Sequence, residues 1–174
     1  MKKILLCLAI IVSINAYSQT EKGGWLLGGS ASFSSSKPTY GDATNFLSIT
    51  PAIGYFITKD LAVGAQATLQ NITNSNTATS FSPFIRYYFL PMGSNAKLFA
   101  NASYGWGNYN LYGGGYTGLS TWAIAAGPAI FLTKNIALEL TISYAADAIT
   151  YYGTTRTIRF NTGFQIHFNK KGKK

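Results

Sequence analysis

The alternation of apolar and polar side chains over residues 156–168 is the feature that most constrains the fold. Large apolar side chains share one parity, at Ile158, Phe160, Phe164, Ile166 and Phe168. Polar side chains share the other parity, at Arg159, Asn161, Gln165 and His167. Because successive side chains of a β-strand point to opposite faces, this stretch predicts a strand with one apolar face and one polar face.

Seven earlier segments alternate in the same way, and a helical period describes none of them as well. They span residues 25–33, 46–57, 61–70, 80–89, 98–107, 121–132 and 136–144. The sequence therefore predicts eight strands. Pro51, Pro83 and Pro128 fall inside three of them, and because proline lacks the N–H of a ladder hydrogen bond, we expect local bulges at these positions.

The composition of the two faces indicates what surrounds the strands. Charged residues make up 11% of the sequence, against about 25% in typical soluble domains. The polar faces carry mainly small or uncharged residues, and their charged members are Arg86, Glu139 and Arg159. We therefore predict an all-β, eight-stranded antiparallel up-and-down transmembrane β-barrel, with the apolar face toward lipid. A soluble lipocalin-type barrel would need disulfides or charged exterior rows that this sequence lacks.

The first 18 residues have the pattern of a secretory signal peptide, with Lys2 and Lys3 before an apolar core too short to span a bilayer. We expect residues 19–169 to form the barrel domain and residues 170–174 to form a basic periplasmic tail. Cys7 would leave with the signal. The net charge of +9 does not indicate nucleic-acid binding, because the basic residues form no stripe outside the tail.

The order of Asn161, Gly163, Ile166 and Phe168 resembles the C-terminal assembly signal of outer-membrane β-barrels. Six further residues follow Phe168, which departs from that pattern. The whole chain resembles the small OmpA/OmpX-type, porin-family-like barrels of Gram-negative bacteria. The resemblance implies a monomer in the cell outer membrane, in contact with lipid, lipopolysaccharide and the barrel-assembly machinery.

The connections between the predicted strands alternate in length. Short turns at 58–60, 91–96 and 133–135 alternate with longer polar loops at 34–45, 71–79, 108–120 and 145–155. Outer-membrane barrels keep short turns in the periplasm and long loops outside. We therefore expect both termini to lie in the periplasm.

The charged residues of the polar faces predict a network inside the barrel. Arg86 and Glu139 lie at similar depth when residues are counted from the turns, and an unpaired charge in a narrow barrel is costly. We expect these two to pair, with Arg159 as the second choice of partner for Glu139. The residues expected around the pair are Gln66, Tyr88, Asn101 and Thr141.

Three functions remain open at this stage. The favoured one is a non-enzymatic barrel with a plugged lumen, acting in envelope structure or in surface interaction through its loops. Candidate recognition residues in those loops are Tyr109, Tyr112, Tyr116, Tyr151 and Tyr152, which equally suit anchoring at the membrane interface. The alternatives are a small-solute pore and a lipid-modifying enzyme. His167 is the sole histidine, and no catalytic residue, metal site or cofactor is predicted.

Overall fold

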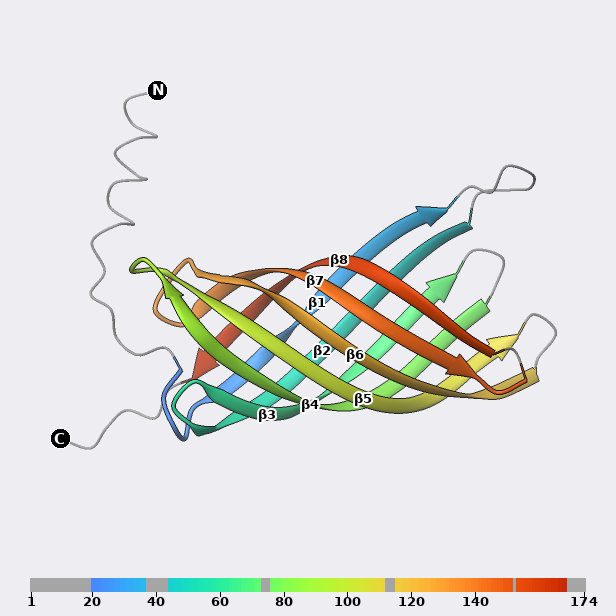
Figure 1. Ribbon diagram of the computed structural model, residues 1–174, viewed down its shortest axis with the longest axis horizontal. Helices are drawn as coiled ribbons and strands as arrows, with labels where there is room; N and C mark the ends of the chain where they lie inside the picture. The colour runs from blue at the N-terminus through green and yellow to red at the C-terminus, as the bar shows by residue number, and fades with distance from the viewer. Residues whose placement is uncertain (1–19, 37–43, 73–75, 112–114, 152, 169–174) are drawn as a thin grey trace, which may run out of the picture.

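The computed structural model describes residues 20–36, 44–72, 76–111, 115–151 and 153–168. They form eight strands: β1 (Trp25–Ser36), β2 (Thr44–Thr58), β3 (Leu61–Ile72), β4 (Asn76–Met92), β5 (Ala96–Leu111), β6 (Gly115–Phe131), β7 (Ile136–Ile149) and β8 (Gly153–Phe168). Each strand pairs antiparallel with the next, and β8 pairs with β1, so the sheet closes into a barrel (Figure 1). The predicted fold class is confirmed. Among the described residues, no helix is long and apolar enough to span a membrane.

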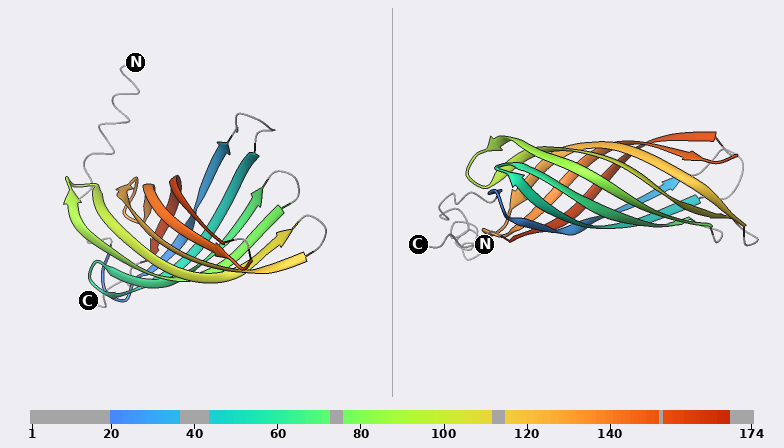
Figure 2. Two further views of the ribbon diagram at one scale, coloured as in Figure 1. Left: turned by 45° about the vertical axis from the view of Figure 1, so that its right-hand side comes forward. Right: turned by 90° about the horizontal axis from the view of Figure 1, so that it is seen from below.

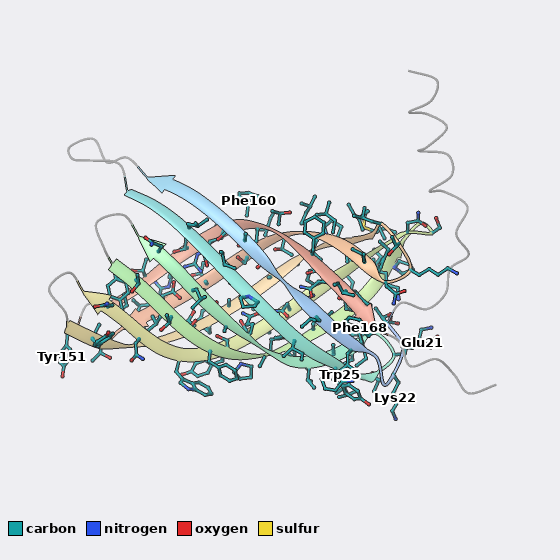
Figure 3. The ribbon with its side chains drawn as sticks, turned by 180° about the vertical axis from the view of Figure 1, so that it is seen from behind. Glu21, Lys22, Trp25, Tyr151, Phe160 and Phe168 are labelled. Atoms are coloured by element: carbon teal, nitrogen blue, oxygen red, sulfur yellow. The ribbon has the colours of Figure 1, made fainter. Side chains whose placement is uncertain are left out.

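The parity of each strand decides which side chains face outward. Ile124 and Ile142 are each 55% exposed on the outside, whereas Phe56 and Phe99 are fully buried inside. Aromatic side chains gather near both ends of the outer surface. The rings of Trp25 and Tyr55 lie 5.1 Å apart, and those of Trp122 and Tyr144 lie 5.5 Å apart. Figure 3 shows Trp25 and Phe168 together at one end of the barrel and Tyr151 at the other.

The strands are longer than the sequence pattern predicts. Strand β3 continues to Ile72 and β4 begins at Asn76, while β7 continues to Ile149 and β8 begins at Gly153. Most of the expected loops 71–79, 108–120 and 145–155 are therefore strand. Backbone pairing does not require apolar alternation, so hairpins rich in threonine, asparagine and tyrosine continue beyond the apolar surface. Three connections at this end are as short as the turns at the other, and loop length no longer indicates the orientation.

The expected bulges at the strand prolines are wrong. Pro51, Pro83 and Pro128 each keep a partner on one neighbouring strand, at Gly29, Ala65 and Leu98. On the other side the pairing is interrupted, and it resumes in the same register. Because proline lacks an N–H, it removes ladder hydrogen bonds to one neighbouring strand, but no extra residue is inserted and no bulge forms. The register shifts instead lie between Phe56 and Thr58 and between Tyr88 and Leu90.

The contact between β1 and β8 closes the barrel over only part of its height. It runs from Trp25 opposite Phe168 to Ala31 opposite Thr162. Glycines allow the close approach here, because a Cβ added at Gly163 would lie 2.5 Å from the Gly29 carbonyl oxygen. Among the described residues beyond this point, β1 pairs only with β2 and β8 only with β7. Both views of Figure 2 show the ends of β1 and β2 diverging from β7 and β8.

A polar cluster connects the residues before β1 to one end of the barrel. This end carries the β2–β3, β4–β5 and β6–β7 turns and is called the turn end below. The Lys97 ammonium donates hydrogen bonds to Asp60 Oδ1 at 2.7 Å and to Thr20 Oγ1 at 2.6 Å. The Thr20 hydroxyl also donates to Asp60, and the Asp60 N–H donates to the Thr20 carbonyl at 2.9 Å. Partial burial alone would raise the pKa of the Asp60 carboxyl, but the hydrogen bonds from Lys97 and Thr20 and the nearby lysine charges hold it below its usual value.

We expect Asp60→Asn to loosen this cluster by less than about 1 kcal/mol, because the ion pair is partly exposed to solvent. A carboxyl with a lowered folded-state pKa contributes stability above its unfolded pKa, and that contribution is lost as the pH falls through the folded value. In the unsubstituted protein, the hydrogen-exchange protection of the residue 60 amide should therefore drop below about pH 4. The Asp60→Asn variant should lack this drop. Glu21→Gln, at an exposed acid nearby, is the matched control.

Candidate functional site: the interior of the barrel

An aromatic layer lies in the interior near the turn end. The His167 ring is fully buried and lies 5.7 Å from the Phe56 ring, 6.0 Å from the Tyr88 ring and 5.2 Å from the Phe131 ring, centroid to centroid. These side chains come from β8, β2, β4 and β6, so the layer is built from strands all round the barrel. Eight strands enclose an interior just wide enough for side chains to fill.

An ion pair crosses the interior next to this layer. Arg86 on β4 donates from Nη1 to Glu139 Oε1 on β7 at 2.8 Å. The same guanidinium donates from Nε to Asn101 Oδ1 at 3.4 Å and from Nη1 to the Tyr88 hydroxyl at 3.5 Å. Arg86 and Glu139 are 7% and 4% exposed, so both charges are removed from bulk solvent.

Aromatic rings and an amide complete the surroundings of the pair. The Arg86 guanidinium carbon lies 4.5 Å from the centroid of the Phe99 ring and 5.6 Å from that of Phe84. The ring faces attract the cation, which offsets part of its lost hydration. The buried Gln165 side chain lies close enough to the Glu139 carboxylate to interact with it. A charge held by several partners in this way becomes costly when one partner is removed.

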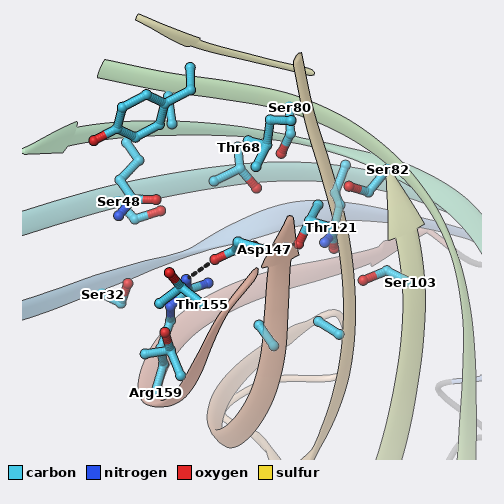
Figure 4. A pocket seen from close by; sticks show the side chains of 18 of the residues that line it. Ser32, Ser48, Thr68, Ser80, Ser82, Ser103, Thr121, Asp147, Thr155 and Arg159 are labelled. Carbon is cyan, nitrogen blue, oxygen red and sulfur yellow. Dashed lines mark hydrogen bonds and ion pairs between the residues drawn. The ribbon is translucent and has the colours of Figure 1, made fainter. Parts of the chain in front are cut away.

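Two adjoining cavities occupy the interior on the far side of the ion pair from the aromatic layer. The smaller has a volume of about 120 Å³ and reaches Arg86 and Glu139. The larger has a volume of about 490 Å³ and is lined mainly by hydroxyl and amide side chains (Figure 4). Arg159 lines both cavities and donates from Nη2 to Asp147 Oδ2 at 2.7 Å. Asp147 also accepts a hydrogen bond from the Thr121 hydroxyl at 2.6 Å.

The structure brings together four of the seven residues expected in the network, namely Arg86, Glu139, Tyr88 and Asn101. Gln66 lines both cavities, and Thr141 lines the smaller one and accepts a hydrogen bond from Asn161 at 3.4 Å. Arg159 has Asp147 as its partner rather than Glu139.

Sequence reasoning missed Asp147, Gln165 and Phe99 as members of the interior groups. Asp147 was expected in a loop, but β7 reaches Ile149 and the parity of Glu139 continues to residue 147. Extending that parity by a few residues would have predicted an inward-facing acid. Gln165 already shared the polar parity of the last strand. The contact between Phe99 and Arg86 has no comparable signal, because it depends on how β4 and β5 pair.

The candidate recognition tyrosines do not form one loop cluster. Tyr109 belongs to β5 and lines the larger cavity, and Tyr116 belongs to β6 with 75% of its surface exposed. Tyr151 lies in the turn after β7 with a φ of 71° and is 96% exposed. Tyr112 and Tyr152 fall outside the described residues.

The residues of the expected assembly signal lie in β8. Asn161 donates a hydrogen bond to the Ser143 hydroxyl at 3.0 Å, and Gly163 is buried opposite Ser30 of β1. Ile166 and Phe168 face outward. Within the described residues, no three histidine, cysteine, aspartate or glutamate side chains are grouped so that they could hold a metal ion.

Comparison with solved structures places this architecture among known proteins. The Neisserial surface protein A structure superposes with a TM-score of 0.68 at 16% sequence identity, covering 83% of this chain and 97% of that one. The N-terminal β-barrel domain of Pseudomonas aeruginosa OprF superposes with a TM-score of 0.63 at 14% identity, covering 84% and 98%. The chain has the fold of the small outer-membrane barrels. No protein-family model matches this sequence, and no curated protein matches it.

We expect Glu139→Ala to lower the free energy of unfolding of this small outer-membrane-type barrel by about 3–5 kcal/mol, because Arg86 would stay buried without its carboxylate. Replacing both partners, as Arg86→Met with Glu139→Leu, should cost much less. Urea titration of the barrel folded into phospholipid vesicles measures both changes. Equal losses in the single and the double variant would show that the pairing itself does not set the cost.

Proposed function

We propose that this protein is an integral barrel of the outer membrane that conducts no solutes and acts in envelope structure or surface interaction. The observation that carries the proposal is the contrast between its two surfaces. The outer surface carries exposed apolar side chains on all eight strands, between aromatic residues near both ends. Inside the barrel, the ion pair and the aromatic layer around His167 lie near one end, and this supports a lumen that is closed to solutes. A non-polar exterior of this kind is stable only in contact with lipid.

The turn end, with Trp25 and Phe168, is proposed to face the periplasm, and the other end the exterior. The resemblance of the last strand to an assembly signal supports recognition by the barrel-assembly machinery and insertion as a monomer beside lipid and lipopolysaccharide. The aromatic residues at the end opposite the turn end, among them Trp122 and Tyr144, are called the upper aromatic residues. The strand ends beyond them would then project from the membrane into the exterior. Tyr116 and Tyr151 are strongly exposed there and suit recognition of a surface ligand.

The two alternative functions have less support. A pore would require a continuous water path past Arg86 and Glu139, and the fully buried Phe56, Phe99 and Leu26 lie nearby. A lipid-modifying enzyme would need a histidine that touches its substrate, whereas His167 is fully buried among aromatic rings.

The membrane placement predicts a contrast between Leu140 on β7 and Arg156 on β8. We expect Leu140→Arg to lower the free energy of unfolding by roughly 2–4 kcal/mol, because it puts a charge on the lipid-facing side near the middle of the apolar surface. Arg156→Ala, at an exposed residue beyond that surface, is the control and should have little effect. Unfolding in vesicles, followed by the difference in gel mobility between unheated and boiled samples, reports both. Recovery of the unsubstituted protein as a soluble monomer would contradict the proposal.

The blocked interior predicts that proteoliposomes holding the protein release a small entrapped dye no faster than empty liposomes. Removing bulk from the aromatic layer should speed up dye release. A combined Phe56→Ala and Phe131→Ala variant that still folds should therefore release the dye faster than empty liposomes. The gel-mobility shift of each sample shows that the barrel is inserted. Steady currents through the unsubstituted barrel in planar bilayers would instead favour the pore.

A further inference from the structure

The larger cavity reaches the outer surface of the barrel through its wall. Its lining includes Thr157 and Arg159, which point into the barrel, and also Ile158 and Phe160, which point out. Neighbouring residues of a strand point to opposite faces, and the outward-facing residues of the lining, Ile158 and Phe160, both lie on this part of β8, so we take the cavity to open at the β8 edge. This is the part of β8 that has no pairing with β1. The interior is therefore continuous here with the surface that faces lipid.

This side opening lies at the depth of the apolar surface. Phe160 sits opposite Ile142 on β7, and Ile158 sits opposite Tyr144, which belongs to the upper aromatic residues. Phe160 and Ile158 are 74% and 66% exposed, compared with 55% for Ile142. They are more exposed because, in the part of the chain that the structure describes, this stretch of β8 pairs with β7 and not with β1. Figure 3 places Phe160 between the Phe168 end and the Tyr151 end of the barrel.

The opening combines an apolar outer lip with a polar interior. Eleven serine, threonine or glutamine side chains line the larger cavity: Ser32, Ser48, Gln66, Thr68, Gln70, Ser80, Ser82, Ser103, Thr121, Thr155 and Thr157. Its two charged side chains, Asp147 and Arg159, already pair with each other at 2.7 Å. The free edges of β1 and β8 add backbone N–H and C=O groups that hydrocarbon cannot satisfy. An occupant with many hydroxyls and no net charge satisfies these groups without breaking the ion pair.

We propose that the larger cavity binds the headgroup of a single-chain amphiphile whose headgroup is uncharged and polyhydroxylated, as in a glycolipid. The alkyl chain leaves through the opening between β1 and β8 and lies on Ile158 and Phe160 in the outer leaflet. The ligand enters sideways from the membrane. The inference rests on the proposed membrane placement, because the opening has meaning only if lipid surrounds the barrel. The cavity volume of about 490 Å³ falls in the range of small-molecule sites.

The probe is radiolabelled dodecyl maltoside, added below its micellar concentration to the barrel in phosphatidylcholine nanodiscs. We expect saturable binding of one molecule per barrel, above the background of empty nanodiscs. Dodecylphosphocholine, with the same chain and a zwitterionic headgroup that has no hydroxyls, should compete at least ten-fold more weakly. The combined variant Thr155→Val and Thr157→Val keeps the shape of the wall and removes two hydroxyls. It should weaken binding about five-fold for each hydrogen bond lost.

A disulfide across the opening tests the route. Extending the β1–β8 register by two residues would bring positions 33 and 160 opposite each other. In the double variant Phe33→Cys and Phe160→Cys, the oxidised disulfide should slow binding and release of the probe at least ten-fold. Reduction of the disulfide should restore both rates. The control, Leu47→Cys with Asn71→Cys, joins β2 and β3 where they already pair and should leave the rates unchanged.

Several results would overturn the inference. Equal binding of the two probes would contradict the headgroup class, and unchanged rates in the oxidised variant would contradict entry from the side. A dimer that forms through the free β1 and β8 edges, seen by light scattering and lost in the oxidised variant, would mean that a second copy fills the opening. The gel-mobility shift is measured on every sample, so failure of membrane insertion is distinguished from failure to bind.

Discussion

Antiparallel backbone pairing carried round a closed circle is the constraint on which the rest of this structure depends. In lipid there is no water to satisfy a free strand edge, so β8 must return to β1. The return works where glycines let the two backbones approach, at Gly28 on β1 and Gly163 on β8. Closure also fixes the parity of every strand. That parity puts Arg86 and Glu139 inside, and it puts Leu140 and Phe160 outside.

A closed circle of eight strands leaves a narrow interior, and this width sets the energetics of the ion pair. Arg86 and Glu139 come from β4 and β7, which are not neighbours in the sheet, yet their side chains meet at 2.8 Å. Removing two charges from water is expensive, and their attraction alone need not repay the cost. The contacts with Phe99, Asn101 and Gln165 offset part of this cost. The stability of the ion pair therefore depends on side chains from strands around the barrel and not on Arg86 and Glu139 alone.

Parity and residue counting were sufficient to predict the barrel, the inward-facing residues and the similar depth of Arg86 and Glu139, because these depend only on local alternation and on the number of residues from each turn. They failed where pairing between strands decides the outcome. Tyr109 and Asp147 looked like loop residues because apolar alternation stops before them, yet backbone hydrogen bonds continue. The prolines suggested bulges, but the neighbouring ladders hold the register. The short contact between β1 and β8 involves residues more than a hundred positions apart and leaves no local trace.

The composition of β1 nevertheless accounts for where that contact ends. Beyond Ala31 the strand reads Ser32, Phe33 and then three serines, whereas the facing part of β8 contains threonines, Ile158 and Phe160. Serine offers little side-chain contact across a strand pair, and such contacts are what stabilise one pairing over another. The same part of β8 keeps its partner on the other side, where Ile142 and Tyr144 of β7 supply bulky neighbours. The barrel thus opens where the sequence of β1 becomes rich in serine, and this is the edge at which its polar cavity meets the outer surface.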